Sequence, residues 1–352
     1  MKKNRFMLIL AVIGTCCIST FAQPRKYRSA IVAFYNLENF YDTVFHGRYD
    51  DETFTPGGSK AYTSAVLNEK TTRLATVISQ IGTNINPDGP ALLGVSEVEN
   101  SAVLQLLVQH PLLSGRHYRY VHYDSKDARG ADVALLYNPR YFRVLKSRPL
   151  YVPLPEGAKT AAYTRDILWV TGLLNEERVQ VFVNHWPSRY GGEKKSEPGR
   201  MAAALTVRKF VDTLIRQNPM AKIIVMGDFN DEPVNNSIVT GMQATDNAAA
   251  IKMGQLYNPW VPLYKKGMGS LAYQDAWSLF DQILIAEGFL DKNQSGFFFY
   301  KNAVFKKDYL IENTGAYKGY PLRSYTGDVY RGGYSDHFPV YMVLLKKAPE
   351  RE

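Results

Sequence analysis

The chain has 352 residues, of which 45% are hydrophobic and 21% are charged, and its formal net charge is +9. This composition supplies enough apolar surface for a sizeable core, so it excludes a globally disordered protein. The excess of basic residues favours an anionic substrate, such as a nucleic acid or another phosphate ester, because opposite charges attract over long distances.

The first 22 residues have the features of a secretory signal peptide. Three of the first five residues are basic, residues 6–18 are mostly apolar, and Ala22 ends a stretch suited to cleavage. The apolar run is shorter than the ~20 residues that a membrane span requires. We therefore expect export to the periplasm or the extracellular space, without stable insertion into the membrane.

Both cysteines, Cys16 and Cys17, lie in this leader. Cleavage after Ala22 leaves a mature chain without cysteine, which excludes a disulfide framework. Attachment of a lipid to Cys16 is the alternative, but residues 13–15 are a poor context for it.

Residues 25–348 show no repeat, low-complexity tract or linker, so we expect a single domain and a monomer. Hydrophobic periodicity predicts helices at 62–81, 99–109, 200–216 and 235–242. Apolar and β-branched runs predict strands at 29–35, 91–95, 118–123, 131–137, 141–152, 163–174, 178–183, 223–226, 279–286, 297–305 and 336–345. Residues 42–60, 191–199 and 244–273 are expected to be loops or irregular. Strands in two groups with several helices predict an α+β fold of paired sheets with helices outside.

The stretch at residues 222–233, KIIVMGDFNDEP, is the centre of the functional prediction. Its apolar start is typical of a buried strand that breaks at Gly227. Asp228 and Asn230 are two residues apart, so they can point the same way along an extended chain. They would stand at the carboxyl end of the strand, where α/β proteins commonly hold their sites. The alternative is a turn, in which Asp and Asn are also common.

Other predicted strands also end in polar side chains that can bind a metal or a phosphate. These residues are Asn36, Glu97, His185, and Asp336 with His337, and Asp281 lies within a further strand. Singly, each has another explanation: Glu97 can cap a helix, His185 can be a hydrogen-bonded core residue, and Asp336 can form a turn. A buried, unpaired carboxylate at Asp281 would be expensive. We therefore expect the set to form one site.

The chemistry of this set points to a metal-dependent hydrolase. Asn, Asp and Glu oxygens suit hard ions such as Mg²⁺ or Mn²⁺. The remaining histidines are scattered, and we expect them to be structural or exposed: His46, His110, His117 and His122. A metal ion beside carboxylates and two histidines fits hydrolysis of a phosphate ester, because an Asp–His pair can activate water.

Six stretches in this order resemble the motifs of the endonuclease/exonuclease/phosphatase superfamily: YNLEN, GVSEVEN, VNHWPSR, MGDFNDEP, FDQILI and SDHFPV. This superfamily includes DNase I, exonuclease III-type AP endonucleases, neutral sphingomyelinases and inositol-polyphosphate 5-phosphatases. The resemblance spans residues 27–345. It implies a DNase I-like, four-layer α/β/β/α sandwich of two mixed sheets, with the site at one end of the sheets.

The resemblance also implies roles for the site residues. Asn36 and Glu97 would bind the metal ion. His185 would contact the phosphate, Asp228 would orient or deprotonate water, and Asn230 would hold the scissile phosphate. Asp281 would support the metal or phosphate side, His337 polarised by Asp336 would be the second histidine, and Arg129 would contact the phosphate. The catalytic tyrosine of the superfamily has no clear match, and the candidates are Tyr118, Tyr120 and Tyr123.

The substrate is less well defined by the sequence. A secreted nuclease is the first hypothesis, and a phosphatase or a sphingomyelinase-like lipid phosphodiesterase is the alternative. A binding module with an inactive site is disfavoured because none of the catalytic positions is substituted. Side chains that could flank the site and stack on bases or bind phosphate follow His185 or precede Asp281: Trp186, Arg189, Tyr190, Tyr273 and Trp277. Ordinary packing is the other explanation for them.

Overall fold

The computed structural model describes residues 27–47, 50–156, 163–293 and 296–348. The expected signal peptide lies outside these residues. No helix among the described residues is long and apolar enough to cross a membrane.

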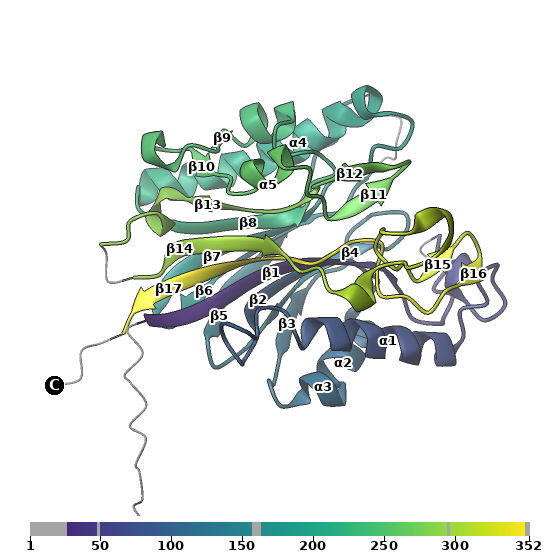
Figure 1. Ribbon diagram of the computed structural model, residues 1–352. Helices are drawn as coiled ribbons and strands as arrows, with labels where there is room; N and C mark the ends of the chain where they lie inside the picture. The colour runs from purple at the N-terminus through teal and green to yellow at the C-terminus, as the bar shows by residue number, and fades with distance from the viewer. Residues whose placement is uncertain (1–26, 48–49, 157–162, 294–295, 349–352) are drawn as a thin grey trace, which may run out of the picture.

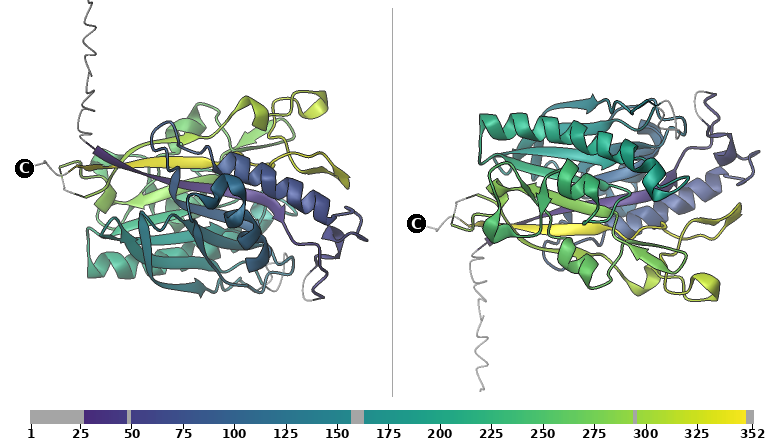
Figure 2. Two further views of the ribbon diagram at one scale, coloured as in Figure 1. Left: turned by 90° about the horizontal axis from the view of Figure 1, so that it is seen from below. Right: turned by 90° about the horizontal axis from the view of Figure 1, so that it is seen from above.

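Two large mixed sheets stack face to face, as Figures 1 and 2 show. The first, six-stranded sheet has the order β14 (Phe298–Val304), β17 (Val340–Lys347), β1 (Tyr27–Phe40), β2 (Pro90–Val98), β4 (Asp132–Tyr137) and β3 (Arg119–His122). The second, seven-stranded sheet has the order β5 (Phe142–Leu150), β6 (Ile167–Leu174), β7 (Glu177–His185), β8 (Lys222–Asp228), β13 (Asp281–Ala286), β10 (Leu256–Tyr257) and β9 (Ala244–Thr245).

Helices cover the outer face of each sheet and complete the four layers (Figure 1). On the first sheet these are α1 (Ser64–Ile78), α2 (Ser101–Gln109) and α3 (Pro111–Ser114). On the second they are α4 (Glu193–Gln217) and the π-helical turn η2 (Ser237–Gly241), whereas Leu263 and Tyr264 of α5 (Val261–Lys265) pack against the core between the sheets. The expected α/β/β/α sandwich is therefore confirmed.

Short elements lie in the connections between these layers. Two hairpins are formed by β11 (Leu271–Tyr273) with β12 (Ala276–Ser278), and by β15 (Tyr325–Thr326) with β16 (Val329–Tyr330). The 3₁₀ turns are η1 (Glu52–Phe54), η3 (Ala248–Ala250), η4 (Glu287–Phe289), η5 (Asp308–Leu310) and η6 (Gly315–Tyr317).

A parallel pair of strands lies inside each sheet, with antiparallel neighbours on both sides. β1 and β2 are parallel in the first sheet, and β7 and β8 are parallel in the second. Their registers bring Asn36 opposite Ser96, and His185 opposite Asp228. Since the carboxyl ends of parallel strands meet at one edge, polar residues at those ends are brought together.

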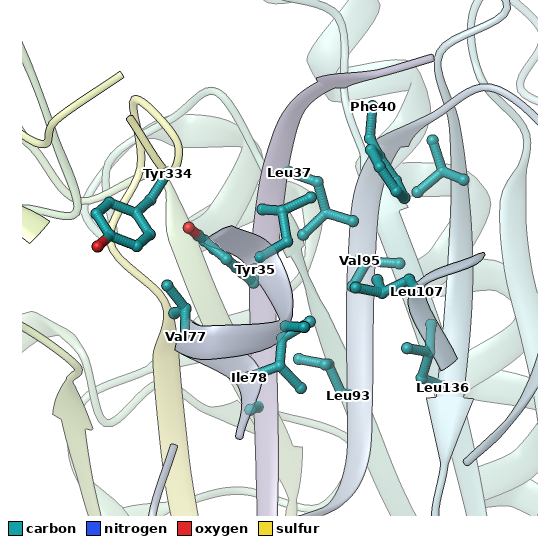
Figure 3. Close-up of a cluster of buried hydrophobic side chains, with 14 of the residues drawn as sticks. Tyr35, Leu37, Phe40, Val77, Ile78, Leu93, Val95, Leu107, Leu136 and Tyr334 are labelled. Carbon is teal, nitrogen blue, oxygen red and sulfur yellow. The ribbon is translucent and has the colours of Figure 1, made fainter. Parts of the chain in front are cut away.

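The apolar faces of the elements form three layers of core. One lies between the first sheet and α1 and α2, where Tyr35, Ile78 and Leu93 pack (Figure 3). A second lies between the sheets, and a third lies under α4. The sheets approach closely at Gly94, because a Cβ atom there would lie 2.5 Å from Sδ of Met226 on the opposite sheet. Gly94 therefore permits the close stacking of the sheets.

Residues 191–199 were expected to be a polar loop, and this expectation is wrong for residues 193–199. The helix α4 begins at Glu193 and contains Pro198 in its second turn. Pro198 removes one backbone donor, but side chains bind carbonyl groups of the first turn. The Ser196 hydroxyl donates to Gly192 O at 2.8 Å, and Arg200 Nη2 donates to Glu193 O at 2.9 Å.

Three strand boundaries near the site also differ from expectation. β1 continues past residue 35 to Phe40, and β8 includes Gly227 and Asp228 instead of breaking at Gly227. β17 begins only at Val340, so Asp336 and His337 precede the strand rather than open it. Pro339, which cannot donate a ladder hydrogen bond, separates them from the strand.

Candidate active site

Side chains from five strands and one loop meet at one end of the two sheets. β1 carries Asn36 and β2 carries Glu97, while His185, Asp228 and Asp281 lie on β7, β8 and β13. Asp281 pairs directly with Asp228 across antiparallel strands. The loop before β17 adds Asp336 and His337 to the same cluster. The structure thus brings the expected residues together from six separate segments.

The Asn36 and Glu97 side chains are held by an irregular part of the β1–β2 pair. The pairing shifts register between Asn36 and Phe40, and Glu38, Asn39 and Glu97 have φ values of 50°, 51° and 59°. Each such residue stores about 1–3 kcal/mol of strain, which proteins concentrate at functional sites. Asn39 N donates to Glu97 Oε2 at 2.8 Å, so the distorted backbone fixes this carboxylate.

Glu97 faces the site with its other oxygen. Oε1 lies 3.6 Å from Arg129 Nη2 and 4.0 Å from His185 Nε2, which is beyond hydrogen-bond length. Burial by itself would raise the pKa of Glu97, but the positive charge of Arg129 and the nearby His185 lower it. An ionised oxygen that accepts no hydrogen bond from the described residues, together with the amide of Asn36, is a donor set that fits Mg²⁺ or Mn²⁺.

His337 is held by a different carboxylate from the one expected. Its Nδ1 lies 2.6 Å from Asp281 Oδ2, whereas its Nε2 is 3.9 Å from Asp336 Oδ1. Asp336 instead accepts a hydrogen bond from Arg323 at 2.6 Å. The expectation that Asp336 polarises His337 is therefore corrected: Asp281 orients the ring and leaves Nε2 directed at Asp228, 3.9 Å away.

The two histidines have opposite charge preferences. Burial lowers the pKa of His337, but Asp281, Asp228 and Asp336 outweigh burial and raise it well above its usual value. Burial and the positive charge of Arg165 hold the pKa of His185 well below its usual value. At neutral pH the site therefore contains a charged His337 and a neutral His185, whose Nδ1 has no hydrogen-bond partner among the described residues.

Asp228 lies between these groups. Its Oδ2 is 3.1 Å from Asn36 Nδ2, 3.7 Å from His185 Nε2 and 3.9 Å from His337 Nε2. Burial raises the pKa of Asp228, His337 opposes this and Asp281 adds to it, with a result of about 7. A carboxyl group with such a pKa can exchange a proton at neutral pH.

Asn230 follows Asp228 in a left-handed conformation, with a φ of 50°. Its backbone N–H donates to Asp228 Oδ1 at 3.0 Å, and its side-chain Nδ2 donates to Trp186 O at 3.0 Å. Arg189 Nε donates to Asn230 O at 2.9 Å. This turn holds Asp228 and Asn230 in fixed positions beside His185.

Several groups near the site were missed by the sequence reasoning. Arg165 is buried, pairs with Asp127 at 3.3 Å and affects the pKa values of His185 and Glu97. Glu38 is buried beside Asp336, accepts from Ser324 N and has a pKa raised to about 7 by burial first and then by Asp336. The available signal for Glu38 was its place within YNLEN, whereas Arg165 only precedes an apolar strand.

The three candidate tyrosines lie outside the cluster. The hydroxyl groups of Tyr118, Tyr120 and Tyr123 donate to the backbone carbonyls of Pro90, Ser101 and Ser147, respectively. None of these bonds involves a site residue.

The aromatic and arginine residues that were expected to flank the site lie in different surroundings. Trp186 is buried and its ring centroid lies 4.5 Å from that of Phe229, so it packs in the core instead of facing a substrate. Arg189 lies over Phe280 and pairs with Glu193 and Asp231, so it has a structural role. Trp277 stacks on Phe338, next to His337 in the sequence.

A cavity of about 440 Å³ adjoins the site at Asp336. It lies between the β11–β12 hairpin and the loops before β17. Polar and aromatic side chains line it, among them Tyr273, Tyr317, Tyr320, Asp275, Arg323 and Arg331. Of these, only Tyr273 was expected from the sequence.

The arrangement was compared with known proteins. A family model described as "Endonuclease/Exonuclease/phosphatase family" matches residues 31–346. A search of the curated proteins found no match.

Solved structures share the fold at low sequence identity. An endonuclease/exonuclease/phosphatase family protein from Bacteroides thetaiotaomicron has a TM-score of 0.56 and 17% identity, with 92% of this chain and 100% of that chain covered. Humanized D. rerio TDP2 has a TM-score of 0.54 and 12% identity, with 90% of this chain and 98% of that chain covered. A mannosyl-6-phosphatase from Bacteroides thetaiotaomicron has a TM-score of 0.53 and 16% identity, with 90% of this chain and 99% of that chain covered. At these identities the likeness shows the fold, whereas the family match covers most of the sequence. The chain therefore belongs to the endonuclease/exonuclease/phosphatase family.

Proposed function

We propose that this protein is an exported, divalent-metal-dependent phosphoester hydrolase that acts on the phosphodiester bonds of nucleic acids. The observation that supports hydrolysis best is the convergence of Glu97, His185, Asp228 and His337 at one point, with Asp228 near both histidines. The export rests on the leader described above, and N-terminal sequencing of the mature protein, expected to begin at Gln23, tests it.

The residues divide the chemistry among them. A Mg²⁺ or Mn²⁺ ion held by Asn36 and Glu97 would supply positive charge to the phosphate and the leaving oxygen. Asp228 accepts a proton from the attacking water, because its pKa of about 7 matches neutral pH. The charged His337, oriented by Asp281, donates a hydrogen bond to a phosphate oxygen from Nε2.

His185 and Asn230 complete the binding of the phosphate in this proposal. The neutral ring of His185 contacts the phosphate from the side opposite His337. Arg129, whose side chain is 45% exposed and whose guanidinium lies 3.6 Å from Glu97, adds positive charge at the mouth of the site. The buried rings of His185 and His337 would act on the phosphate more strongly than they would in water.

Nucleic acid is the favoured substrate for three reasons. Without the three basic residues of the leader, the mature chain would carry a net charge of 9 − 3 = +6, which attracts polyanions. Tyr273 and Tyr317 are exposed at the cavity beside Asp336, where aromatic rings can stack on bases. A D. rerio TDP2 of the same fold was solved in complex with a single-strand DNA product.

A small phosphate ester is the second candidate, and the cavity is the observation that favours it. A volume of about 440 Å³ with carboxylate, guanidinium and phenol groups on its walls suits a compact polar alcohol such as a sugar. The mannosyl-6-phosphatase of similar fold is named for such a substrate.

A substrate panel tests the proposal. Single- and double-stranded DNA, RNA, sphingomyelin, inositol phosphates, a hexose 6-phosphate and bis-p-nitrophenyl phosphate are assayed with Mg²⁺, with Mn²⁺ and with EDTA. We expect hydrolysis of DNA or RNA that EDTA abolishes. Turnover of the hexose phosphate alone would establish the second candidate, and no metal-dependent turnover of any ester would contradict hydrolysis.

The Glu97→Gln variant is expected to keep the fold and to require a higher metal concentration for half-maximal activity. The amide oxygen keeps the shape of the side chain but removes the negative charge that attracts the cation. Activity is measured against Mg²⁺ concentration for the wild type and the variant, with Glu69→Gln on the surface of α1 as the control. An unchanged metal dependence would remove Glu97 from the metal site.

A further inference from the structure

We propose that a second divalent cation, of the Zn²⁺ or Mn²⁺ type, binds to Asp42, His46, Asp51 and Glu99. This cation site is separate from the metal site proposed at Asn36 and Glu97, and its existence does not depend on the proposed reaction. His46 was expected from the sequence to be exposed or structural.

The cation site joins two segments that follow the strands β1 and β2. Asp42, His46 and Asp51 come from the connection between β1 and α1, and Glu99 lies between β2 and α2. Asp42, His46 and Glu99 each offer a ligand atom within 4.8 Å of the others. His46 Nε2 is 3.1 Å from Asp42 Oδ2 and 3.8 Å from Glu99 Oε1. Ligand atoms around a tetrahedral ion with bonds of about 2.0–2.1 Å lie roughly 3.3 Å apart, so small shifts would bring these three ligand atoms to that spacing.

Asp51 supplies the independent sign that a ligand belongs here. The residue is 2% exposed, and its Oδ1 has no hydrogen-bond partner within the described residues. Its Oδ2 accepts only a long bond of 3.3 Å from His46 N. The side chain of Asp51 lies next to that of Glu99. A buried carboxylate oxygen left without a donor is expensive, and a cation would satisfy it.

The charge balance of the cluster also calls for a cation. Three carboxyl groups gather around one imidazole, and two of them, Asp51 and Glu99, are buried. Carboxylate groups held this close repel one another, and burial strengthens the repulsion because less water screens it. Within the described residues, a bound cation, or a proton held between two of the carboxyl groups, would relieve this repulsion.

The donor types select the class of ion. Carboxylates alone would suit Ca²⁺ or Mg²⁺, but an imidazole nitrogen is a poor ligand for those ions and a good one for Zn²⁺. His46 is partly exposed, so an ion can enter from solvent. Asn100 Nδ2 donates to Asp42 Oδ2 at 2.8 Å and orients that ligand, as groups around metal ligands commonly do.

A cation at this place would strengthen the catalytic end of the sheets. Asp42 is three residues after Asn39, whose N–H holds Glu97, and Glu99 is two residues after Glu97. Asp42 N already donates to Glu99 Oε2 at 2.7 Å. An ion bound by both residues would fix the ends of β1 and β2 relative to each other.

Zn²⁺ binding to metal-free protein, measured by titration calorimetry, tests the inference. All proteins carry Glu97→Gln, so that the proposed catalytic metal site is already weakened. We expect one Zn²⁺ site, with its dissociation constant raised at least tenfold by Asp51→Asn and by His46→Gln. Asp308→Asn, a change at an exposed aspartate in η5, is the matched control and should bind as the parent does.

Two further measurements separate metal binding from a shared proton. Zn²⁺ should raise the melting temperature of the parent but not that of the Asp51→Asn variant, which in metal-free form should be at least as stable as the parent because it has one carboxylate fewer. Co²⁺ should give the visible absorption of a four-coordinate site, and this absorption should disappear in His46→Gln. Absence of Zn²⁺ binding, or equal binding by the parent and both variants, would overturn the inference. Equal affinity for Ca²⁺ that His46→Gln leaves unchanged would also overturn it.

Discussion

The Asp281→Asn variant is expected to lose turnover by about 10²–10⁴-fold while it remains folded. Asp281 Oδ2 lies 2.6 Å from His337 Nδ1, which makes it the shortest contact of that ring. The carboxylate holds Nε2 towards Asp228 and stabilises the positive charge on the ring. An amide of the same shape can offer only a neutral oxygen or an N–H group, so the orientation or the charge of His337 is lost.

The charge of His337 gives this prediction a second readout. In the wild type, burial opposes the positive charge, but Asp281 and the other carboxylates raise the pKa of His337 well above its usual value. Without the charge at residue 281, burial has more influence and the pKa falls. An NMR titration of the ring should show this fall.

The sign of the stability effect follows from the same pKa. A histidine with a raised folded-state pKa contributes stability that is fully present below its unfolded pKa of about 6.5. That contribution is lost as the pH rises through the folded-state pKa. The wild type should therefore exceed Asp281→Asn in unfolding free energy by more at pH 6 than at pH 9.

The control for Asp281→Asn is Asp246→Asn, which changes an exposed aspartate paired with Lys265. Turnover, the His337 titration and denaturant unfolding are measured for all three proteins. Near-wild-type turnover in Asp281→Asn, with the pKa of His337 unmoved, would exclude Asp281 as the residue that positions His337.

The single variants His185→Ala and His337→Ala are each expected to lose about 10²–10⁴ in kcat on a phosphodiester. Their Nε2 atoms lie 3.7 and 3.9 Å from the same oxygen, Oδ2 of Asp228. In the proposed mechanism, both rings therefore act on one phosphate. Because residues that act as a unit are not additive, the double variant should be far less impaired than the product of the two losses.

This second prediction is measured as kcat for the wild type, both single variants and the double variant, with His117→Ala at an exposed turn as the control. A single variant with near-wild-type kcat would remove that histidine from the mechanism. Fully multiplicative losses would mean that the histidines act independently, which is incompatible with a shared site.

The sequence was a good guide to residues whose position depends on a strand. Apolar runs located the central strands, and polar residues at their ends, such as Asn36, Glu97 and His185, fall at one edge because parallel strands share a direction. The order of the six motifs then indicated the two-sheet sandwich.

Contacts between residues far apart in the sequence were harder to predict. Asp336 was expected to polarise His337 because the two are adjacent, yet Asp281, 56 positions away, makes the bond. Adjacent side chains of an extended segment point in opposite directions, whereas side chains from different strands of a sheet can meet. A single sequence does not show which distant segments will meet. For Trp186 the sequence left two explanations open, a place beside the substrate and ordinary packing, and the buried ring packs on Phe229.

The start of α4 shows a different limit of prediction from the sequence. One proline and three glycines in residues 191–199 favour a loop by local preference. The helix forms there because Arg200, which is fully buried, pairs with Asp231 at 2.7 Å and also bonds the first turn. Tertiary contacts overrode the local signal.

The place of β17 in the first sheet determines when the sheet and the candidate site become complete. β17 lies between β14 and β1, so the N-terminal strand gains its second neighbour only from residues 340–347. His337 comes just before that strand in the sequence, so it is also synthesised late. Such long-range closure is slow, because the chain must form a large loop before the contact forms.

A ribosome-bound or partly translocated chain therefore lacks both the closed sheet and His337. If the protein is exported and hydrolyses nucleic acids, as we propose, this order of synthesis would keep nascent chains inert towards the nucleic acids of the producing cell until the last strand is in place.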